Sequence, residues 1–233
     1  MKIITTIILS TLLILVGNCT TTTTQYYASF TPFSGVNCTG SISGQGSSYL
    51  LNTCLPYGDK YSIKYVPNND NTAFTPIYYL YNADCSRFPT KDTTLNIGQC
   101  YSNEINDPDN GLFYSSASIQ SEPLAPPSSG QPSLYSRFFD KSDQSCSETM
   151  LWSQFYTNNT AYDVNFTQRE TFYCDPITNN PMQQICNLGG NKECTTNDLS
   201  SKCQYDNTYL ANSIYTCVDG TTSDDIIKVR HIK

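Results

Sequence analysis

Histidine is almost missing from this sequence, because the only one among 233 residues is His231, close to the C-terminus. Ser-His-Asp and Cys-His nucleophiles both need an imidazole as the base, and many catalytic metal sites use it as a ligand. The G-x-S-x-G elbow, the phosphate-binding loop and the dinucleotide fingerprint G-x-G-x-x-G are missing as well. These absences exclude most familiar enzyme classes, so we expect no catalytic residues, no bound metal and no cofactor.

Basic residues are also few. Lys and Arg total 13 against 20 acidic residues, which gives a net charge of -7, and the basic residues gather only in the C-terminal tail. A nucleic-acid-binding protein would carry a basic patch or stripe, so nucleic acid is excluded as a partner.

Long apolar runs are absent except at the start, where residues 3–16 follow Lys2 and precede small and polar residues. This pattern is typical of a secretory signal peptide, which we place at residues 1–19 with cleavage between Gly17 and Gln25. The run is too short for a comfortable membrane span, although an uncleaved anchor is the alternative. We therefore expect a secreted, extracellular protein without stable membrane insertion after cleavage.

Cysteine, in contrast, is abundant, with eleven residues. Cys19 lies at the border of the signal peptide. The other ten are an even number, which in a secreted chain predicts a disulfide framework. The absence of any C-x-x-C pair argues against a zinc site. The ten cysteines expected in disulfides are Cys38, Cys54, Cys85, Cys100, Cys146, Cys174, Cys186, Cys194, Cys203 and Cys217.

Three sequons follow the signal peptide and predict N-glycosylation at Asn37, Asn158 and Asn165. The threonine run in residues 20–25 is typical of a disordered start to the mature chain.

Two cysteine-containing stretches are alike: "FSGVNCTG" at 33–40 and "LYNADCSR" at 80–87. Cys38 and Cys85 lie 47 positions apart, and Cys146 and Cys194 lie 48 apart. A fixed period of this length indicates a repeated supersecondary unit. The spacing predicts four related units in two pairs, near residues 30–75, 78–118, 136–176 and 190–220.

The segment "SEPLAPPSSGQPSL", residues 121–134, separates the two pairs. Its prolines cannot donate ladder hydrogen bonds and favour extended chain. We predict a linker here between a first β domain at 26–120 and a second at 135–220, followed by a tail at 221–233. A long loop inside one domain is the alternative.

Local patterns favour strands. In "YSIKYV", residues 61–66, and in "AYDVNFTQ", residues 161–168, apolar and polar residues alternate, which gives a strand one buried and one wet face. The wet face would include Asn165. "TTNDLSSK", residues 195–202, predicts one short helix. The fold class we expect is all-β, with two tandem Greek-key-like β-sandwich domains held by disulfides.

The repeat also predicts a disulfide pairing. Within the first pair of units, Cys38 would join Cys54 and Cys85 would join Cys100. By equivalent position the second half would pair its cysteines in the same manner, leaving two for each other. Those bonds would be Cys146–Cys174, Cys194–Cys203 and Cys186–Cys217.

The repeated unit, an aromatic residue, a turn, Asn/Asp-Cys-Ser/Thr and a second cysteine about fifteen residues later, resembles the Greek-key motif of βγ-crystallin-like proteins. That resemblance implies two motifs in each sandwich. The calcium motif of those proteins is incomplete here, so we expect no dedicated calcium site. The whole chain is similar to an uncharacterised family of small secreted proteins of social amoebae, which implies no activity.

Eighteen tyrosines and Trp152 are the remaining feature. Tyrosine suits half-buried strands, and Trp152 is expected in the core, but exposed tyrosine rings also suit sugar faces. We expect a non-catalytic recognition protein for carbohydrate or an extracellular glycoprotein, at the cell surface or in the matrix. The alternatives are an extracellular structural or coat protein, and a small glycosidase that uses two carboxylates from Glu148, Glu170, Glu193 and Asp163.

Overall fold

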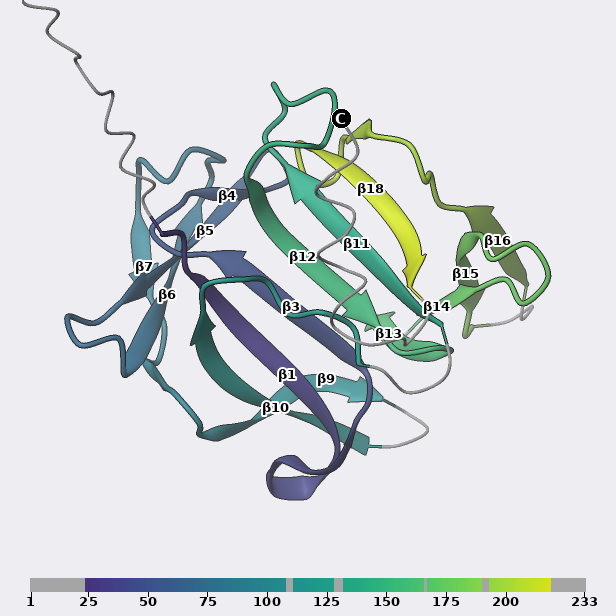
Figure 1. The fold of residues 1–233 in the computed structure, drawn as a ribbon, viewed down its shortest axis with the longest axis horizontal. Helices are drawn as coiled ribbons and strands as arrows, with labels where there is room; N and C mark the ends of the chain where they lie inside the picture. Colours follow the sequence, from purple (N-terminus) through teal and green to yellow (C-terminus); the bar gives the residue numbers. More distant parts are fainter. Residues whose placement is uncertain (1–23, 108–110, 128–131, 166, 190–192, 219–233) are drawn as a thin grey trace, which may run out of the picture.

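The computed structural model describes residues 24–107, 111–127, 132–165, 167–189 and 193–218, and almost every element in them is an antiparallel strand (Figure 1). The one exception is η1, a short 3-10 turn at Val36–Cys38. The all-β prediction is confirmed. In this part of the chain, no helix is long and apolar enough to cross a membrane.

The largest sheet contains strands from both halves of the chain, in the order β17-β18-β11-β12-β3-β1-β10-β9, with β2 paired beside β1. Its strands are β1 (Tyr27–Gly35), β2 (Thr39–Ile42), β3 (Gln45–Leu50), β9 (Cys100–Asp107), β10 (Gly111–Gln120), β11 (Ser133–Phe139), β12 (Met150–Tyr156), β17 (Gln204–Asp206) and β18 (Ala211–Val218). We call this the main sheet. Strand β3 of the first half pairs directly with β12 of the second.

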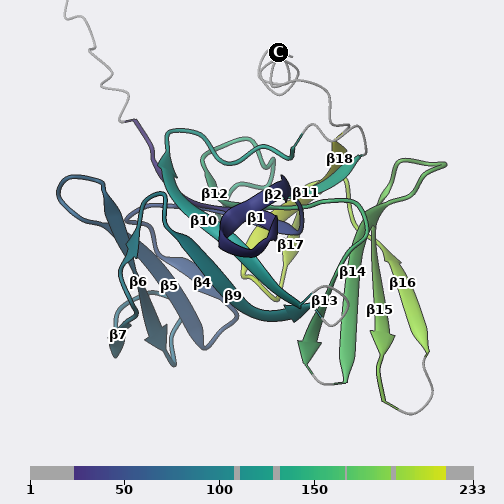
Figure 2. The same ribbon diagram turned by 90° about the horizontal axis from the view of Figure 1, so that it is seen from below.

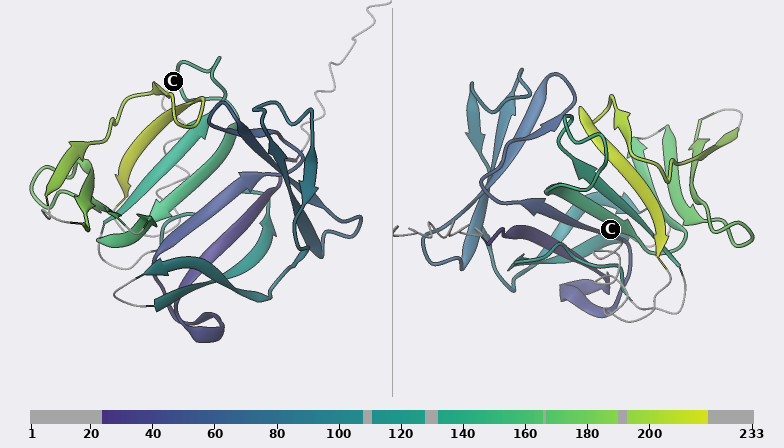
Figure 3. Two further views of the ribbon diagram at one scale, coloured as in Figure 1. Left: turned by 180° about the vertical axis from the view of Figure 1, so that it is seen from behind. Right: turned by 45° about the horizontal axis from the view of Figure 1, so that its top comes forward.

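Two smaller sheets extend from the same side of the main sheet, one at each end (Figures 2 and 3). The first contains β4 (Leu55–Tyr57), β5 (Tyr61–Pro67), β6 (Ala73–Leu80), β7 (Pro89–Lys91) and β8 (Leu95–Asn96). The second contains β13 (Thr160–Asn165), β14 (Gln168–Cys174), β15 (Pro181–Asn187) and β16 (Cys194–Asp198). Each smaller sheet is formed within one half of the chain, so the halves have the same general plan.

A single hydrophobic core serves both halves. Phe138 and Trp152 stack with ring centroids 4.6 Å apart under β11 and β12, and Tyr49 stacks on Tyr65 at 4.7 Å under β3. Trp152 is 4% exposed, so it lies in the core as expected. Since the core and the main sheet are continuous across β3 and β12, the two predicted domains are not separate sandwiches. Their strands share one sheet because β3, at the edge of the first half, pairs with β12, at the edge of the second.

The proline-rich segment also differs from a free linker. As far as residue 127 it follows the main sheet, where the Leu124 N–H donates to the Ser48 hydroxyl at 2.8 Å and Pro126 is buried. It lies between β10 and β11, where the chain passes from its first half to its second. The segment is nevertheless docked as far as residue 127, because Pro126 is buried and the Leu124 N–H has a partner on the sheet.

The internal repeat is twofold rather than fourfold. Reading the main sheet from either end gives equivalent strands: β9 with β17, β10 with β18, β1 with β11, and β3 with β12. The loop after β1 is joined to β9 by Cys38–Cys100, and the loop after β11 is joined to the start of β17 by Cys146–Cys203. Each repeat therefore spans about half the chain.

All ten expected cysteines form disulfides, but the predicted partners are wrong in every case. The bonds are Cys38–Cys100, Cys54–Cys85, Cys146–Cys203, Cys174–Cys217 and Cys186–Cys194. The predicted pairing assumed units of about 47 residues that close on themselves. In the structure the bonds instead join segments that the pairing of strands brings together, and four of the five join cysteines 31 to 62 positions apart. No bond crosses residues 121–134.

Two local predictions also need correction. Residues 195–202 begin in β16 rather than in a helix, because Thr195 and Thr196 pair with β15 beside the Cys186–Cys194 bond. In β5 the expected wet residue Ser62 is 2% exposed, since its hydroxyl donates to the Asn82 carbonyl and accepts the Cys85 N–H.

The loop between β11 and β12 is organised by one carboxylate. Asp143 is 3% exposed and accepts the N–H groups of Ser145, Ser147 and Glu148 at 2.8–3.1 Å. Burial opposes ionisation, but these hydrogen bonds outweigh it and hold the pKa of Asp143 below its ordinary value. Asn212 of β18 adds a donor to the Asp143 carbonyl at 2.9 Å. The loop is therefore fixed to the sheet next to Cys146.

Candidate functional site

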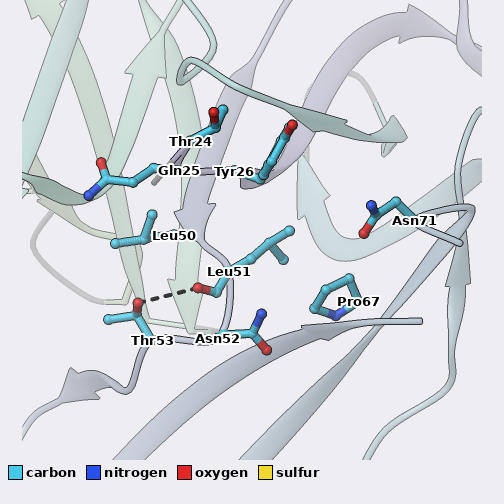
Figure 4. Close-up of a pocket in the computed structure, with 9 residues that line it drawn as sticks. All are labelled: Thr24, Gln25, Tyr26, Leu50, Leu51, Asn52, Thr53, Pro67 and Asn71. Carbon is cyan, nitrogen blue, oxygen red and sulfur yellow. Dashed lines mark hydrogen bonds between the residues drawn. The ribbon is translucent and has the colours of Figure 1, made fainter. Parts of the chain in front are cut away.

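Two hollows on the described surface were compared as binding sites. The first, near the start of β1, has a volume of about 310 Å³ and is lined mostly by polar side chains (Figure 4). Its only aromatic residue is Tyr26. The Gln25 amide, which points away from Asn71 in Figure 4, already donates to the Thr149 hydroxyl at 3.0 Å. The polar groups do not converge on one point.

The second hollow lies where the two halves meet, and its volume is about 540 Å³. The turn between β4 and β5 forms one wall, and the turn between β17 and β18 forms the other. We call it the tyrosine groove. Its lining residues are Tyr57, Gly58, Asp59, Lys60, Tyr61, Asn207, Thr208 and Leu210.

The first wall places two tyrosines side by side. Tyr57 ends β4 and Tyr61 begins β5, and they are direct partners in the antiparallel ladder. Directly opposed residues project on the same face of a sheet. Tyr57 is 57% exposed and Tyr61 is 48% exposed, so both rings present surface to the groove.

The turn joining these tyrosines depends on Gly58. Its φ of +67° lies in the left-handed region, which glycine adopts without steric cost. A Cβ at this position would lie 3.7 Å from the Thr208 carbonyl oxygen, so the two walls approach closely here.

The second wall is held by an aspartate turn. The Asp206 carboxylate accepts the Thr208 N–H at 2.8 Å, and the Tyr215 hydroxyl lies 3.4 Å from the same carboxylate. Tyr209 packs edge-on against Tyr57 at 5.5 Å and against Phe138 at 4.9 Å. Both groove walls are therefore anchored to the shared core before any ligand binds.

Burial raises the pKa of Tyr209 well above the ordinary tyrosine value, and the neighbouring hydroxyl of Tyr57 acts in the same direction. Burial likewise raises the pKa of Tyr215, with the Asp206 carboxylate as the next contribution. These hydroxyls stay protonated at physiological pH, so they act as neutral hydrogen-bonding groups and not as charges.

The chemistry of the groove suits recognition. Two tyrosine rings offer apolar faces, while Asp59, Asn207 and Thr208 offer hydrogen-bonding atoms at the rim. Sugar-binding surfaces need this combination of a flat apolar face and polar edge groups, and a concave site of this volume is of the usual size for a small ligand. Asp59 is the one acidic residue among those that line the groove, and the Asp206 carboxylate is occupied in holding the turn of the second wall. Among the described residues, no group of three His, Cys, Asp or Glu side chains could hold a metal ion.

The structure places the candidate glycosidase carboxylates on different elements. Glu148 lies in the β11–β12 loop, Glu170 on β14, and Glu193 just before β16. Glu170 accepts hydrogen bonds from the amides of Gln168 at 3.2 Å and Gln183 at 2.9 Å. The side chain of Asp163 lies outside the described residues.

The three sequons differ in their surroundings. Asn37 is exposed within η1, next to the disulfide-bonded Cys38. Asn158 is half-buried, with its side-chain oxygen removed from solvent, and the Thr160 hydroxyl of that sequon donates to the Thr157 carbonyl at 2.6 Å. Asn165 ends β13, and its side chain lies outside the described residues. The predicted signal peptide, the threonine-rich stretch before residue 24 and the C-terminal tail also fall outside the described residues.

Sequence reasoning identified tyrosine as the notable residue type but did not select Tyr57 and Tyr61. A signal was present, since "YGDKY" combines a Gly-Asp turn with a tyrosine on each side. The opposite wall comes from residues 207–210, about 150 positions later, and nothing in the local sequence indicates that contact.

A comparison with protein-family models matches residues 1–215 to the family described as Counting factor-associated protein A/B/C. The match agrees with the expected relation to a secreted family of social amoebae. Neither the comparison with curated proteins nor the comparison with solved structures finds a match, so the crystallin-like Greek key is not confirmed.

Proposed function

This chain belongs to the counting factor-associated protein A/B/C family, and we propose that it is a secreted, non-catalytic recognition protein whose tyrosine groove binds a neutral saccharide. The saccharide would be part of an extracellular glycoprotein or of the matrix. The family's description associates its members with a counting factor, and we extend that association to this chain as a reason to test a counting factor as its partner.

The observation that carries the proposal is the pair of half-exposed tyrosines, Tyr57 and Tyr61, held next to each other at a polar rim. Such rings lose exposed apolar surface when a sugar ring stacks on them, while the sugar hydroxyls keep polar partners. Ordering costs are small because Tyr57 is already packed against Tyr209.

Other features support an extracellular, non-catalytic role. Five disulfides are typical of proteins that mature in an oxidising compartment. A groove with one carboxylate lacks the pair that glycosidic bond hydrolysis requires.

The test is a glycan array probed with the oxidised, secreted protein and two variants, Tyr61→Ala and Tyr205→Ala. Tyr205 is the matched control, because it is 47% exposed but lies on β17 outside the groove. We expect the wild type and Tyr205→Ala to bind the same glycan class, and Tyr61→Ala to bind about tenfold more weakly, which corresponds to roughly 1.4 kcal/mol.

Binding by Tyr61→Ala at wild-type strength would remove the groove as the site. A protein that binds no glycan on the array but sediments as a concentration-dependent assembly would instead support the structural or coat role.

A further inference from the structure

We propose that the tyrosine groove continues onto the inner face of the first smaller sheet and binds a flat, β-1,4-linked, gluco-configured oligosaccharide of at least two or three sugar rings. The inference rests on the proposed function, because it names the class of saccharide and the length of the site. It is carried by a strip of four neighbouring side chains, which we call the sheet strip: Tyr57, Tyr61, Leu80 and Tyr78.

Strand register places these side chains together. Tyr61 of β5 is paired with Tyr57 of β4 on one side and with Leu80 of β6 on the other. Tyr78 precedes Leu80 by two positions and therefore projects on the same face, opposite Ile63. The strip is thus one row across three strands, with one further ring along β6.

The strip is apolar surface that the described residues leave open. Its exposed fractions are 57% for Tyr57, 48% for Tyr61, 41% for Tyr78 and 37% for Leu80. On the same face, nearer the main sheet, Leu55 and Tyr65 are 1% and 7% exposed. The face passes from buried to open because the sheet extends beyond the main sheet that covers its upper part (Figure 2). A contiguous exposed apolar patch of this kind marks an interaction site.

The dimensions of the strip fit more than one sugar ring. Directly opposed residues in an antiparallel pair lie about 5 Å apart, so three strands give a row of roughly 10 Å. Tyr78 lies two residues from Leu80 along β6, so it widens this end of the row by about 6.6 Å at right angles to it. The step between neighbouring strands is comparable with the length of one pyranose residue in an extended chain, so a single sugar would leave half of the row uncovered.

The shape of the strip selects the linkage. Side chains on one face of three short strands form a gently twisted surface, and an extended ribbon that follows the twist buries more area against it than a curved chain does. In a β-1,4-linked gluco-configured chain every linkage and hydroxyl is equatorial, so each ring exposes C–H groups on its faces and the chain forms a ribbon. An α-1,4-linked glucan curves, and only one of its rings would lie on the strip.

Charge and edge groups agree with a neutral ligand. The chain carries a net charge of -7, which disfavours sulfated or carboxylated polysaccharides through long-range repulsion. Asp59, Lys60, Asn207 and Thr208 line the groove at the Tyr57–Tyr61 end, where they can reach the hydroxyls along the edge of a ribbon. The apolar row binds ring faces, and the rim fixes the position of the chain.

The experiment is isothermal titration calorimetry with cellohexaose, chitohexaose, their disaccharides and maltohexaose, on the full oxidised protein. We expect at least one of the two β-1,4-linked hexasaccharides to bind ten times more tightly than its disaccharide, and maltohexaose to bind no better than a disaccharide. The choice between the cello and chito series reports whether acetamido groups are recognised.

The variant Leu80→Ser tests the strip separately from the groove. It should remove most of the tenfold advantage of the hexasaccharide and leave disaccharide binding unchanged, whereas Tyr205→Ala should change neither. Near-UV circular dichroism and melting temperature check that both variants are folded.

Three results would overturn the strip while the proposed saccharide function stands. They are equal affinity for a disaccharide and its hexasaccharide, equal affinity for maltohexaose and the β-1,4-linked hexasaccharides, and binding on the glycan array without binding of the cello or chito series. Wild-type behaviour of Leu80→Ser would overturn it in the same way. Absence of binding to every saccharide in both experiments would reject the proposed function and the strip together.

Discussion

The Phe155 ring occupies the space that a side chain on Gly46 would need, and this gives a quantitative prediction for Gly46→Ala. Gly46 of β3 is the ladder partner of Phe155 of β12, at the junction between the two halves. A Cβ on Gly46 would lie 2.1 Å from Cε1 and 2.3 Å from Cζ of the Phe155 ring. Carbon atoms in contact prefer about 3.5–4.0 Å, so the ring must move by roughly 1.5 Å.

The cost follows from how tightly the ring is held. Phe155 is 2% exposed, and protein interiors are close-packed, so the displacement resembles overpacking, which typically costs about 1–3 kcal/mol. Replacing glycine by alanine inside a strand returns about 0.5–1 kcal/mol of backbone entropy. We expect a net loss of about 1–2 kcal/mol, which for a chain of this size corresponds to a melting temperature lower by roughly 2–8 °C.

Urea and thermal unfolding of the oxidised protein would measure this. The matched control is Gly189→Ala, the same chemical change at a glycine where no atom of the described residues lies within 4 Å of the added Cβ, and stability there should change by less than about 0.5 kcal/mol. The double variant Gly46→Ala with Phe155→Leu should lose less than the sum of the two single changes, because both act on one contact. A Gly46→Ala protein as stable as Gly189→Ala would show that the two halves are not joined as described.

Three further predictions concern stability and modification. Asp143→Asn should lose about 1–3 kcal/mol at pH 7, since the carboxylate accepts three backbone N–H groups. Because its folded pKa is lowered, this stabilisation is present above the unfolded value near 4 and is lost as the pH falls through the folded value, so the difference in unfolding free energy between wild type and variant should narrow as the pH is lowered below 4. Asn37→Gln should remove one glycan from the secreted protein on a gel while Asn158→Gln leaves its mobility unchanged, and equal shifts would contradict the difference in exposure. Unfolding of the intact oxidised chain should be one transition by near-UV circular dichroism and calorimetry, and the separate fragments 24–127 and 132–218 should lack native near-UV signals; two resolved transitions would count against one shared core.

Alternation of residue types predicted one strand well, because a strand with one buried face has a period of two that is visible locally. The second alternating stretch, residues 161–168, instead contains the end of β13 and the start of β14, so it spans a hairpin and not a single strand. Residues 61–66 form most of β5, and Tyr65 is buried as the pattern indicates. The exception, Ser62, is buried by a loop twenty residues later in the chain, which the alternation cannot include.

The disulfide partners and the candidate site could not be predicted for the same physical reason. Both depend on which strands become neighbours. Cys38 meets Cys100 because β10 pairs with β1 and β9 pairs with β10. Tyr57 meets Tyr209 because the β17–β18 hairpin of the second half lies against the β4–β5 hairpin of the first half. Cysteine spacing along the chain indicated a repeat, but the predicted period near 47 residues is too short. The repeat in the structure is half the chain, and it is visible only in the order of the strands.

The palindromic order of the main sheet also has a consequence for how this protein assembles. In each half, the strand that faces the other half, β3 or β12, is an open edge until its counterpart arrives. In a newly made or denatured chain, β3 can pair with the β12 of a second chain instead of its own. Two chains that exchange halves in this way would form a domain-swapped, or exchanged, dimer with the same strand pairs as the monomer. We therefore expect the share of exchanged dimer to rise with chain concentration during refolding, and dilute refolding with the disulfides of each half already formed to favour the monomer.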